Sequence, residues 1–259
     1  MQPSNAHPTM KSLYLAWQAP RQRSWFPIGR LDADTHAHRY VFNYTKGALH
    51  AQQEGGFQAL PAFPDLQRSY ESAELFPLFQ NRVLDRSRKD FAEYLQSLGL
   101  TEPDPIEILA LTGGERETDN LEVFPRIQKQ PDGRFKCRFF VHGLRYIPKS
   151  AAERGLQLQV GERLGVSIEL TNPKTRLAIQ LTSADYHFVG WTPHYLVEDL
   201  LTVISDGPVA IEAHVLRVNR DVVPANRRVL VEFNGQFPKG IEPMSSEPFH
   251  LIDERQGRH

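Results

Sequence analysis

The sequence of 259 residues lacks the features that mark several large classes of protein. It has one cysteine, Cys137, which excludes an internal disulfide and a cysteine-based zinc site. No run of about eighteen apolar residues occurs, so we expect no membrane span. Residues 1–11 lack the basic start and apolar core of a secretory signal, and we expect them to be flexible. These absences make the cytoplasm the default location.

The sequence also lacks the common signatures of catalysis. It has no glycine-rich phosphate loop, no nucleophile elbow and no His-Glu-x-x-His motif. The acids of the central region fall on different turns, and its histidines are scattered. His36 and His38 share one polar loop, but two histidines without further ligands predict no metal site. We therefore expect a protein that is not an enzyme and that needs neither a cofactor nor a metal.

Positive charge is not in excess over the whole sequence, but it is in excess in one region. The formal net charge is −1, with 40% apolar and 24% charged residues, which is typical of a soluble globular protein. Residues 126–190 hold 11 Lys and Arg against 5 Asp and Glu, whereas residues 1–125 hold 12 against 16. Such a local excess indicates either a solvated sheet face or a surface that binds nucleic acid.

The first half of the chain predicts a small α+β domain over residues 12–120. Alternating apolar residues predict strands over 13–17, 25–31 and 39–44, which form an antiparallel meander. Apolar residues at helical spacing predict a helical hairpin over 87–98 and 104–110. Its second helix is short and acidic, so a structural role is a better interpretation than a DNA-binding helix-turn-helix.

The second half predicts a small, partly open β-barrel of the OB type with one helix, over residues 121–237. About six strand-like runs are followed or separated by turn signals, and a helix is predicted over 195–204. Residues 238–259 read as a polar tail that frays. The chain as a whole is therefore predicted to be an α+β protein with a boundary near residue 121.

Cations and apolar residues alternate along residues 134–140. By the two-residue period of a strand, one face carries Arg134, Lys136 and Arg138. The opposite face is apolar and includes Cys137, which is expected in the core rather than as a nucleophile. The pattern predicts a basic outer face over an apolar interior.

Two phrases in the first half carry a family resemblance. Residues 26–31, Phe-Pro-Ile-Gly-Arg-Leu, and residues 74–82, Glu-Leu-Phe-Pro-Leu-Phe-Gln-Asn-Arg, resemble the N-terminal subdomain of HipA-like proteins. The resemblance covers about residues 12–100 and implies a half that docks a partner protein. The family's kinase core has no counterpart here, so no ATP chemistry is implied.

Five short motifs in the second half carry a more specific resemblance. They are Gly-Leu-Arg-Tyr at 143–146, Gly-Glu at 161–162, Asn-Pro at 172–173 with Ala-Ile at 178–179, Val-Gly at 189–190, and Pro193 before a helix. In this order and spacing they resemble the HIRAN domain, a small β-barrel module. The resemblance implies an OB-type fold that captures the 3′ end of single-stranded DNA.

The resemblance also implies roles for individual residues. Arg145 and Tyr146 match the family's Arg-Tyr pair, and Asn172 matches the Asn of its turn. Tyr146 would stack on a base, and Arg145 would bind a phosphate. Lys174 and Thr175 replace an aromatic residue and an acid, so two parts of the family's 3′-hydroxyl pocket are altered in this chain.

Two functions remain open at this point. In the first, the barrel is a non-catalytic module that binds single-stranded DNA or DNA ends. Its candidate contact residues are Arg145, Tyr146, Asn172, Lys174, Arg176, Arg134, Lys136 and Arg138. In the second, the protein is a regulatory component that binds a partner protein through its first half and does not touch DNA. Trp191 lies directly before the predicted helix and is interpreted as core rather than as a stacking residue.

Overall fold

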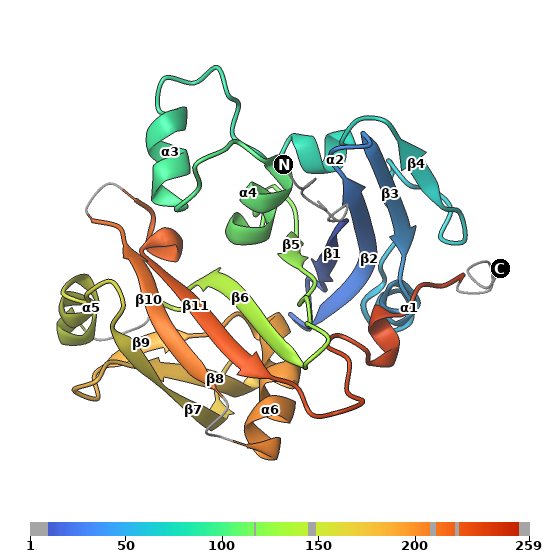
Figure 1. Cartoon of the computed structure of the whole chain (residues 1–259). Helices are drawn as coiled ribbons and strands as arrows, with labels where there is room; N and C mark the ends of the chain where they lie inside the picture. Colours follow the sequence, from blue (N-terminus) through green and yellow to red (C-terminus); the bar gives the residue numbers. More distant parts are fainter. Residues whose placement is uncertain (1–9, 117, 145–148, 208–210, 221–222, 254–259) are drawn as a thin grey trace, which may run out of the picture. The chain divides into compact units, whose positions relative to one another are not determined.

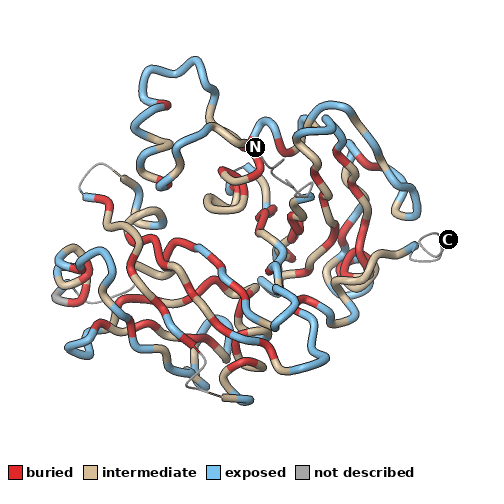
Figure 2. The backbone as a smooth tube through the Cα atoms, viewed as in Figure 1, coloured by how far each residue is buried: buried red, intermediate tan, exposed pale blue. Residues whose placement is uncertain are grey.

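The structure is a computed structural model that describes residues 10–116, 118–144, 149–207, 211–220 and 223–253 (Figure 1). This part of the chain contains two antiparallel sheets and six α-helices, which confirms the predicted α+β class. Buried residues lie along the strands of both sheets (Figure 2). Most of the predicted flexible N-terminus, residues 1–9, lies outside the described residues.

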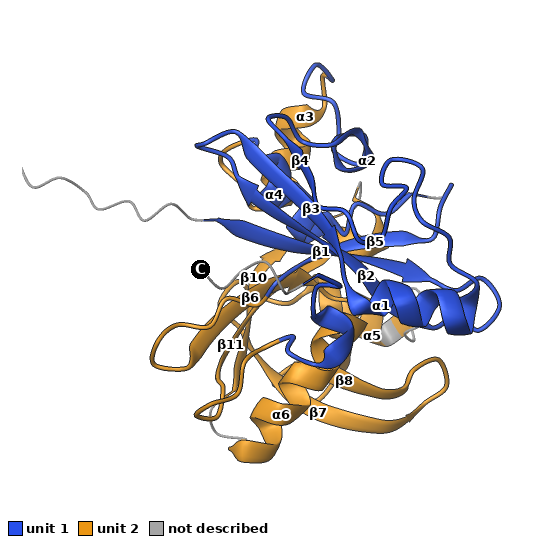
Figure 3. Ribbon diagram, turned by 90° about the vertical axis from the view of Figure 1, so that its right-hand side faces the viewer, with its two compact units in different colours: residues 1–88, 103–126, 244–259 blue, residues 89–102, 127–243 orange. Residues whose placement is uncertain are grey.

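Two compact units divide the chain. Unit 1 comprises residues 1–88, 103–126 and 244–259, and unit 2 comprises residues 89–102 and 127–243 (Figure 3). Each unit therefore takes chain from both sides of the boundary that was predicted near residue 121. The two helices expected to form a hairpin are α3 (Phe91–Ser97) in unit 2 and α4 (Pro105–Thr112) in unit 1.

Unit 1 is built on a sheet that begins with the N-terminal meander. Its strands lie in the order β4 (Tyr70–Ser72), β3 (Arg39–Tyr44), β2 (Trp25–Asp34), β1 (Lys11–Gln18) and β5 (Leu121–Pro125). The three predicted strands are thus confirmed as β1, β2 and β3. Pro27 fits into the middle of this sheet because the β1–β2 register shifts beside it, between Leu15 and Ala16.

The core of unit 1 is centred on Phe42, which is fully buried. Its ring stacks on Phe63 with 4.0 Å between the centroids, and the ring of Phe79 lies 6.0 Å away. Gly29 makes room for this ring, because a Cβ at that position would lie 2.4 Å from Phe42. Helix α2 (Pro77–Gln80) supplies Phe79 to the same cluster.

Tyr44 fixes the long connection between β3 and β4. Its hydroxyl donates to the Phe63 carbonyl at 2.7 Å and accepts the Leu60 N–H at 2.8 Å. The connection starts with α1 (Lys46–His50), which continues as a π-helical turn over Ala51–Gly55. This connection is therefore partly helical and is tied to the core.

The segment from Met244 to Ile252 is ordered as part of unit 1, although the sequence predicts that it frays. Leu251 forms a β-bridge with Thr45, and the Ile252 N–H donates to the Tyr44 carbonyl at 3.1 Å. The ring of Phe249 packs edge-on against Tyr14 with 4.9 Å between centroids. Apolar residues within a polar stretch account for this order. Residues 254–259 lie outside the described part.

Unit 2 is built on a second antiparallel sheet. Its strands lie in the order β6 (Arg134–Phe140), β11 (Val229–Gln236), β10 (Glu212–Val218), β7 (Arg163–Asn172), β8 (Arg176–Thr182) and β9 (Phe188–Trp191). Burial alternates along β6 as predicted, and Cys137 lies in the core. Burial raises the pKa of its thiol to about 12, so the cysteine stays protonated at neutral pH.

The two edges of this sheet meet at a single point. His142, just beyond β6, donates its N–H to the Trp191 carbonyl at 2.9 Å and accepts the Trp191 N–H at 3.1 Å. One bridge of this kind does not make a ladder, so the described strands form a curled sheet rather than a closed barrel.

The predicted helix at 195–204 is confirmed as α6 (Val197–Asp206), which follows a short 3₁₀ turn and buries Leu200 and Val203. A further helix, α5 (Lys149–Leu156), was not expected from the sequence. Arg154 ties α5 to the sheet, with its Nη2 atom 2.7 Å from Glu162 Oε1 and 2.9 Å from Asp185 Oδ1. Among the described residues, no helix is long and apolar enough to span a bilayer.

Candidate nucleic-acid interface

The turn between β7 and β8 is organised by the side chain of Asn172. Its Oδ1 atom accepts the backbone N–H groups of Lys174 at 3.0 Å and Thr175 at 3.2 Å. The Thr175 hydroxyl donates to the same oxygen at 3.1 Å. This is an Asx turn, in which a side-chain carbonyl replaces a backbone acceptor. Arg176 follows with a left-handed φ of 65°, so the turn presents Lys174, Thr175 and Arg176 to solvent.

A carboxylate stands beside this turn. The Asn172 Nδ2 group donates to Glu169 Oε2 at 3.0 Å, and Trp191 Nε1 donates to the same oxygen at 2.6 Å. The Asn172 bond, followed by bonds from Trp191 and Gln180, holds the pKa of Glu169 below its usual range despite partial burial. Glu169 is therefore ionised at neutral pH and held in one orientation.

Trp191 and Phe188 add an aromatic surface to this cluster. Both are half-buried, and their rings pack edge to face with 4.6 Å between the centroids. Gly143 lies against the Trp191 ring, since a Cβ there would be 2.1 Å from its Cε3 atom. Trp191 is thus only half-buried, whereas a core residue would be fully buried, and its side chain is held by Glu169 and Phe188. It links β9 to the carboxylate beside the turn.

The two residues that matter most to the HIRAN resemblance, Arg145 and Tyr146, lie outside the described residues. The described chain runs to Leu144 and resumes at Lys149, the first residue of α5. The contact between Gly143 and Trp191 nevertheless places the entry to this segment at the Trp191 ring.

The cations of β6 are on the outer face, as predicted, but acids neutralise much of their charge. Arg134 Nε lies 2.6 Å from Asp132 Oδ2. Lys136 and Arg138 share Glu232, at 3.4 and 3.0 Å. Burial would raise the pKa of Glu232, but the Arg138 hydrogen bond and the two neighbouring charges outweigh it and lower the pKa. The field of this strip is therefore weaker than the sequence suggests.

Cross-strand pairing places the β6 strip and the turn on the same face of the sheet. Arg138 pairs with Glu232, which pairs with His214, which pairs with Arg163 at the start of β7. Glu169 follows Arg163 at an even spacing along β7 and so shares its face. Glu232 lies between Arg138 and Arg163 in this row of paired residues. The face that joins the β6 strip to the turn is therefore mixed in charge rather than uniformly positive.

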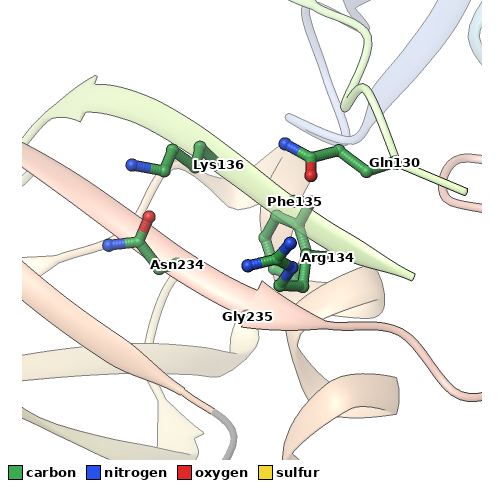
Figure 4. A pocket seen from close by; sticks show the side chains of 6 residues that line it. All are labelled: Gln130, Arg134, Phe135, Lys136, Asn234 and Gly235. Atoms are coloured by element: carbon green, nitrogen blue, oxygen red, sulfur yellow. The ribbon is translucent and has the colours of Figure 1, made fainter. Parts of the chain in front are cut away.

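A hollow of about 240 Å³ lies over β6 and β11 (Figure 4). It is lined by Gln130, Arg134, Phe135, Lys136, Asn234 and Gly235. Ligand pockets usually measure about 300–1,000 Å³, so this hollow suits a group such as a phosphate rather than a whole ligand. Among the described residues, no cluster of three or more His, Cys, Asp or Glu side chains could hold a metal ion.

Sequence reasoning found the turn but missed Glu169, Phe188 and Arg163. The signal for Glu169 is its place three residues before Asn172, within reach of the turn. The role of Trp191 depends on a hydrogen bond to a residue 22 positions away, which no local pattern indicates.

No family model and no curated protein matches the chain. Two solved structures are similar to part of it. A protein from Lactobacillus plantarum has 15% sequence identity and a TM-score of 0.32, with 41% of this chain and 100% of that chain covered. The HIRAN domain of human HLTF has 19% identity and a TM-score of 0.26, with 43% and 79% covered. At these scores, neither similarity establishes a shared fold or a correspondence of residues.

Proposed function

We propose that unit 2 binds nucleic acid, as a non-catalytic module of the HIRAN type that engages single-stranded DNA or DNA ends. The proposal rests above all on the cluster at the β7–β8 turn. There, two exposed cations, an oriented carboxylate and a half-exposed aromatic pair stand together. Phosphate, base edge and base face each have a chemical counterpart in this set.

Each part of the cluster has a distinct role in this proposal. Lys174 and Arg176 contact phosphates, and within the described residues the Arg176 guanidinium has no hydrogen bond or ion pair of its own. The Trp191–Phe188 pair receives the edge or face of a base. Glu169 accepts a hydrogen bond from an exocyclic amino group or a sugar hydroxyl, since it is ionised and already oriented.

An unpaired strand or an end suits this site better than the interior of a duplex. A base can reach aromatic side chains and a carboxylate only after it leaves the stack, and this costs least where it is unpaired. The β6 strip would then add phosphate contacts along the same face, at Arg134, Lys136 and Arg138.

Fluorescence anisotropy with short labelled oligonucleotides tests this proposal over a salt series. Lys174→Ala with Arg176→Ala should weaken binding to single strands about tenfold or more, and should reduce the salt slope by about 0.7 for each phosphate that the variant no longer binds. Arg21→Ala with Arg23→Ala removes two exposed cations from unit 1 and is the matched control. Wild-type affinity in the turn variant, or binding that does not respond to salt, would show that the turn is not the interface.

A further inference from the structure

Strand β7 has no partner among the described residues on one side over most of its length. On that side β10 pairs only with Arg163 and Leu164, whereas on the other side β8 pairs along Gly165–Glu169. Within the described part of the chain, no backbone hydrogen bond reaches the β10 side of residues 165–171. Figure 3 shows β7 and β8 extending as a two-stranded ribbon. Within the part of the chain that the structure describes, residues 165–171 therefore form an open strand edge, a common site of pairing with another chain.

The backbone groups that point to this edge can be identified from the ladder. The Ile179 carbonyl accepts the Thr192 N–H at 3.0 Å, so Ile179 makes its backbone bonds on the β9 side of β8. Ile179 pairs with Ile168, which makes these two a non-hydrogen-bonded pair of the β7–β8 ladder. The N–H and C=O of Ile168 therefore point away from β8, and by alternation so do those of Val166, whereas a register shift between Glu169 and Asn172 interrupts the alternation at Leu170.

These same residues carry apolar side chains that are not covered. Leu170 is 74% exposed and Ile168 is 41% exposed, while Val166 is half-buried. Exposed edge strands usually carry lysine, proline or a bulge, which discourage pairing. β7 has such a bulge only beyond Glu169. Before it, the outward-pointing backbone groups of Val166 and Ile168 coincide with apolar side chains, which favours strand addition.

We propose that this edge pairs with the same edge of a second copy of the chain, antiparallel about a two-fold axis at Ile168. Ile168 is the midpoint of the open edge, so symmetric pairing uses all of it. Each Ile168 would face its counterpart, and Val166 of one copy would face Leu170 of the other. Glu169, the one charged residue on residues 165–171, would face Ser167 and not another acid. A two-fold interface requires such self-complementarity.

Charge at the ends of the edge favours the same occupant. In this register, the hairpin tip of one copy, with Lys174 and Arg176, lies at the start of β10 in the other copy. Glu212 begins β10, and its side chain is 53% exposed. Cations thus meet an acid at both ends of the shared ladder. A peptide of unrelated sequence could form the same backbone hydrogen bonds, but it would lack these complementary charges at the two ends of the ladder.

The dimer is tested by sedimentation of the full chain without nucleic acid, so that its outcome is independent of DNA binding. The contact is small, and interfaces below about 1,200 Å² are weak, so we expect a monomer–dimer equilibrium on the order of micromolar or weaker. Ile168→Lys puts two like charges opposite each other on the axis and should weaken dimerisation about tenfold or more. Val160→Lys adds the same charge at an exposed site off the edge and should change nothing.

The axis itself is tested by a charge swap. Ile168→Glu should also yield monomers, but an equal mixture of Ile168→Glu and Ile168→Lys should dimerise, because residue 168 then faces its opposite charge. Recovery in the mixture also shows that both variants are folded. A wild-type chain that stays monomeric up to about 500 μM, well above the range expected for such an interface, overturns the proposal. A dimer unaffected by Ile168→Lys places the interface elsewhere, and a mixture that fails to associate excludes the two-fold axis.

Discussion

The two units enclose ionisable groups of opposite kinds, a buried acid in unit 1 and two half-buried histidines in unit 2. In unit 1, Glu122 is 4% exposed, and burial together with the charge of Glu115 raises its pKa to about 8. In unit 2, burial lowers the pKa of His142 to about 4, and burial with the nearby His142 lowers that of His194 to about 3. At neutral pH all three side chains are uncharged, because their surroundings do not solvate a charge.

This difference gives the units opposite responses to pH. Folded unit 1 keeps the Glu122 proton above the ordinary pKa of 4.5, so its stability is full below that pH and falls as the pH rises toward about 8. The histidines of unit 2 take up protons in the unfolded chain from pH 6.5 downward, but in the folded state only near pH 4 or below. Unit 2 therefore loses stability as the pH falls. The loss in unit 1 thus extends from about pH 4.5 up to about 8, and the loss in unit 2 extends from about pH 6.5 downward.

The largest expected effect comes from removing the central ring of one core. Phe42→Ala should lower the free energy of unfolding of unit 1 by about 3–5 kcal/mol, because the buried ring stacks on Phe63 and its loss leaves a cavity. Amide hydrogen exchange resolves this by segment. It should show faster exchange in β1–β3 and unchanged exchange in β10 and β11.

Phe233→Ala is the matched variant in unit 2. Phe233 is fully buried, with its ring 6.4 Å from that of Phe139. This variant should speed exchange in β10 and β11 and leave β1–β3 unchanged. Equal acceleration in both units by either variant would mean that they unfold together, and the contrast between them would not hold.

A smaller effect, which depends on pH, is expected at Glu122. Between about pH 5 and 8 this group should cost unit 1 about 1.4 kcal/mol per pH unit, and Glu122→Gln should remove that slope. Urea unfolding across this range measures it. Glu115→Gln should lower the pH at which this loss of stability ends, since it removes only the second cause of the raised pKa.

His142→Gln is the control for this experiment. It should reduce the loss of stability of unit 2 below about pH 6.5 and leave the slope between about pH 6.5 and 8 as it is in the wild type. The assignment of the loss between about pH 5 and 8 to Glu122 is wrong if Glu122→Gln retains the wild-type slope.

The smallest expected effect separates steric contact from backbone strain in unit 2. Gly143 and Gly161 both have positive φ, at 79° and 85°, but a Cβ would meet Trp191 only at Gly143. Gly143→Ala should therefore cost about 1–3 kcal/mol more than Gly161→Ala. The emission of Trp191 should shift as well, measured with Trp17→Phe and Trp25→Phe so that one tryptophan remains. Equal costs and equal spectra would show that the ring moves freely.

Local periodicity predicted the parts of the fold that depend on near neighbours. Strands β1, β2, β3 and β6 follow from alternation, and α6 follows from helical spacing. The assignment of segments to units could not be predicted, because it depends on pairing between distant parts of the chain. Thr45 forms a β-bridge with Leu251, more than two hundred residues later in the sequence. Short-range sequence patterns do not predict such a bond.

The candidate site shows the same limit. The turn at Asn172 was predicted because its bonds span two or three residues. The basic strip was overestimated because the acid that pairs with Arg138 is 94 residues away. A count of charged residues along the sequence gives the charge of a strand. It does not show which opposite charges lie on the neighbouring strands of the sheet.

The C-terminal segment of unit 1 has a consequence for the order in which the chain folds during synthesis. Lys46 and Tyr44 exchange backbone hydrogen bonds with His250 and Ile252, at 2.8 and 3.1 Å. A ribosome produces the first strands of unit 1 early, but it releases their last partners only after every residue of unit 2 has been translated. Synthesis of unit 1 thus begins before that of unit 2 and ends after it. Until residue 252 emerges, the backbone groups of Tyr44 and Lys46 that pair with this segment have no partner from it.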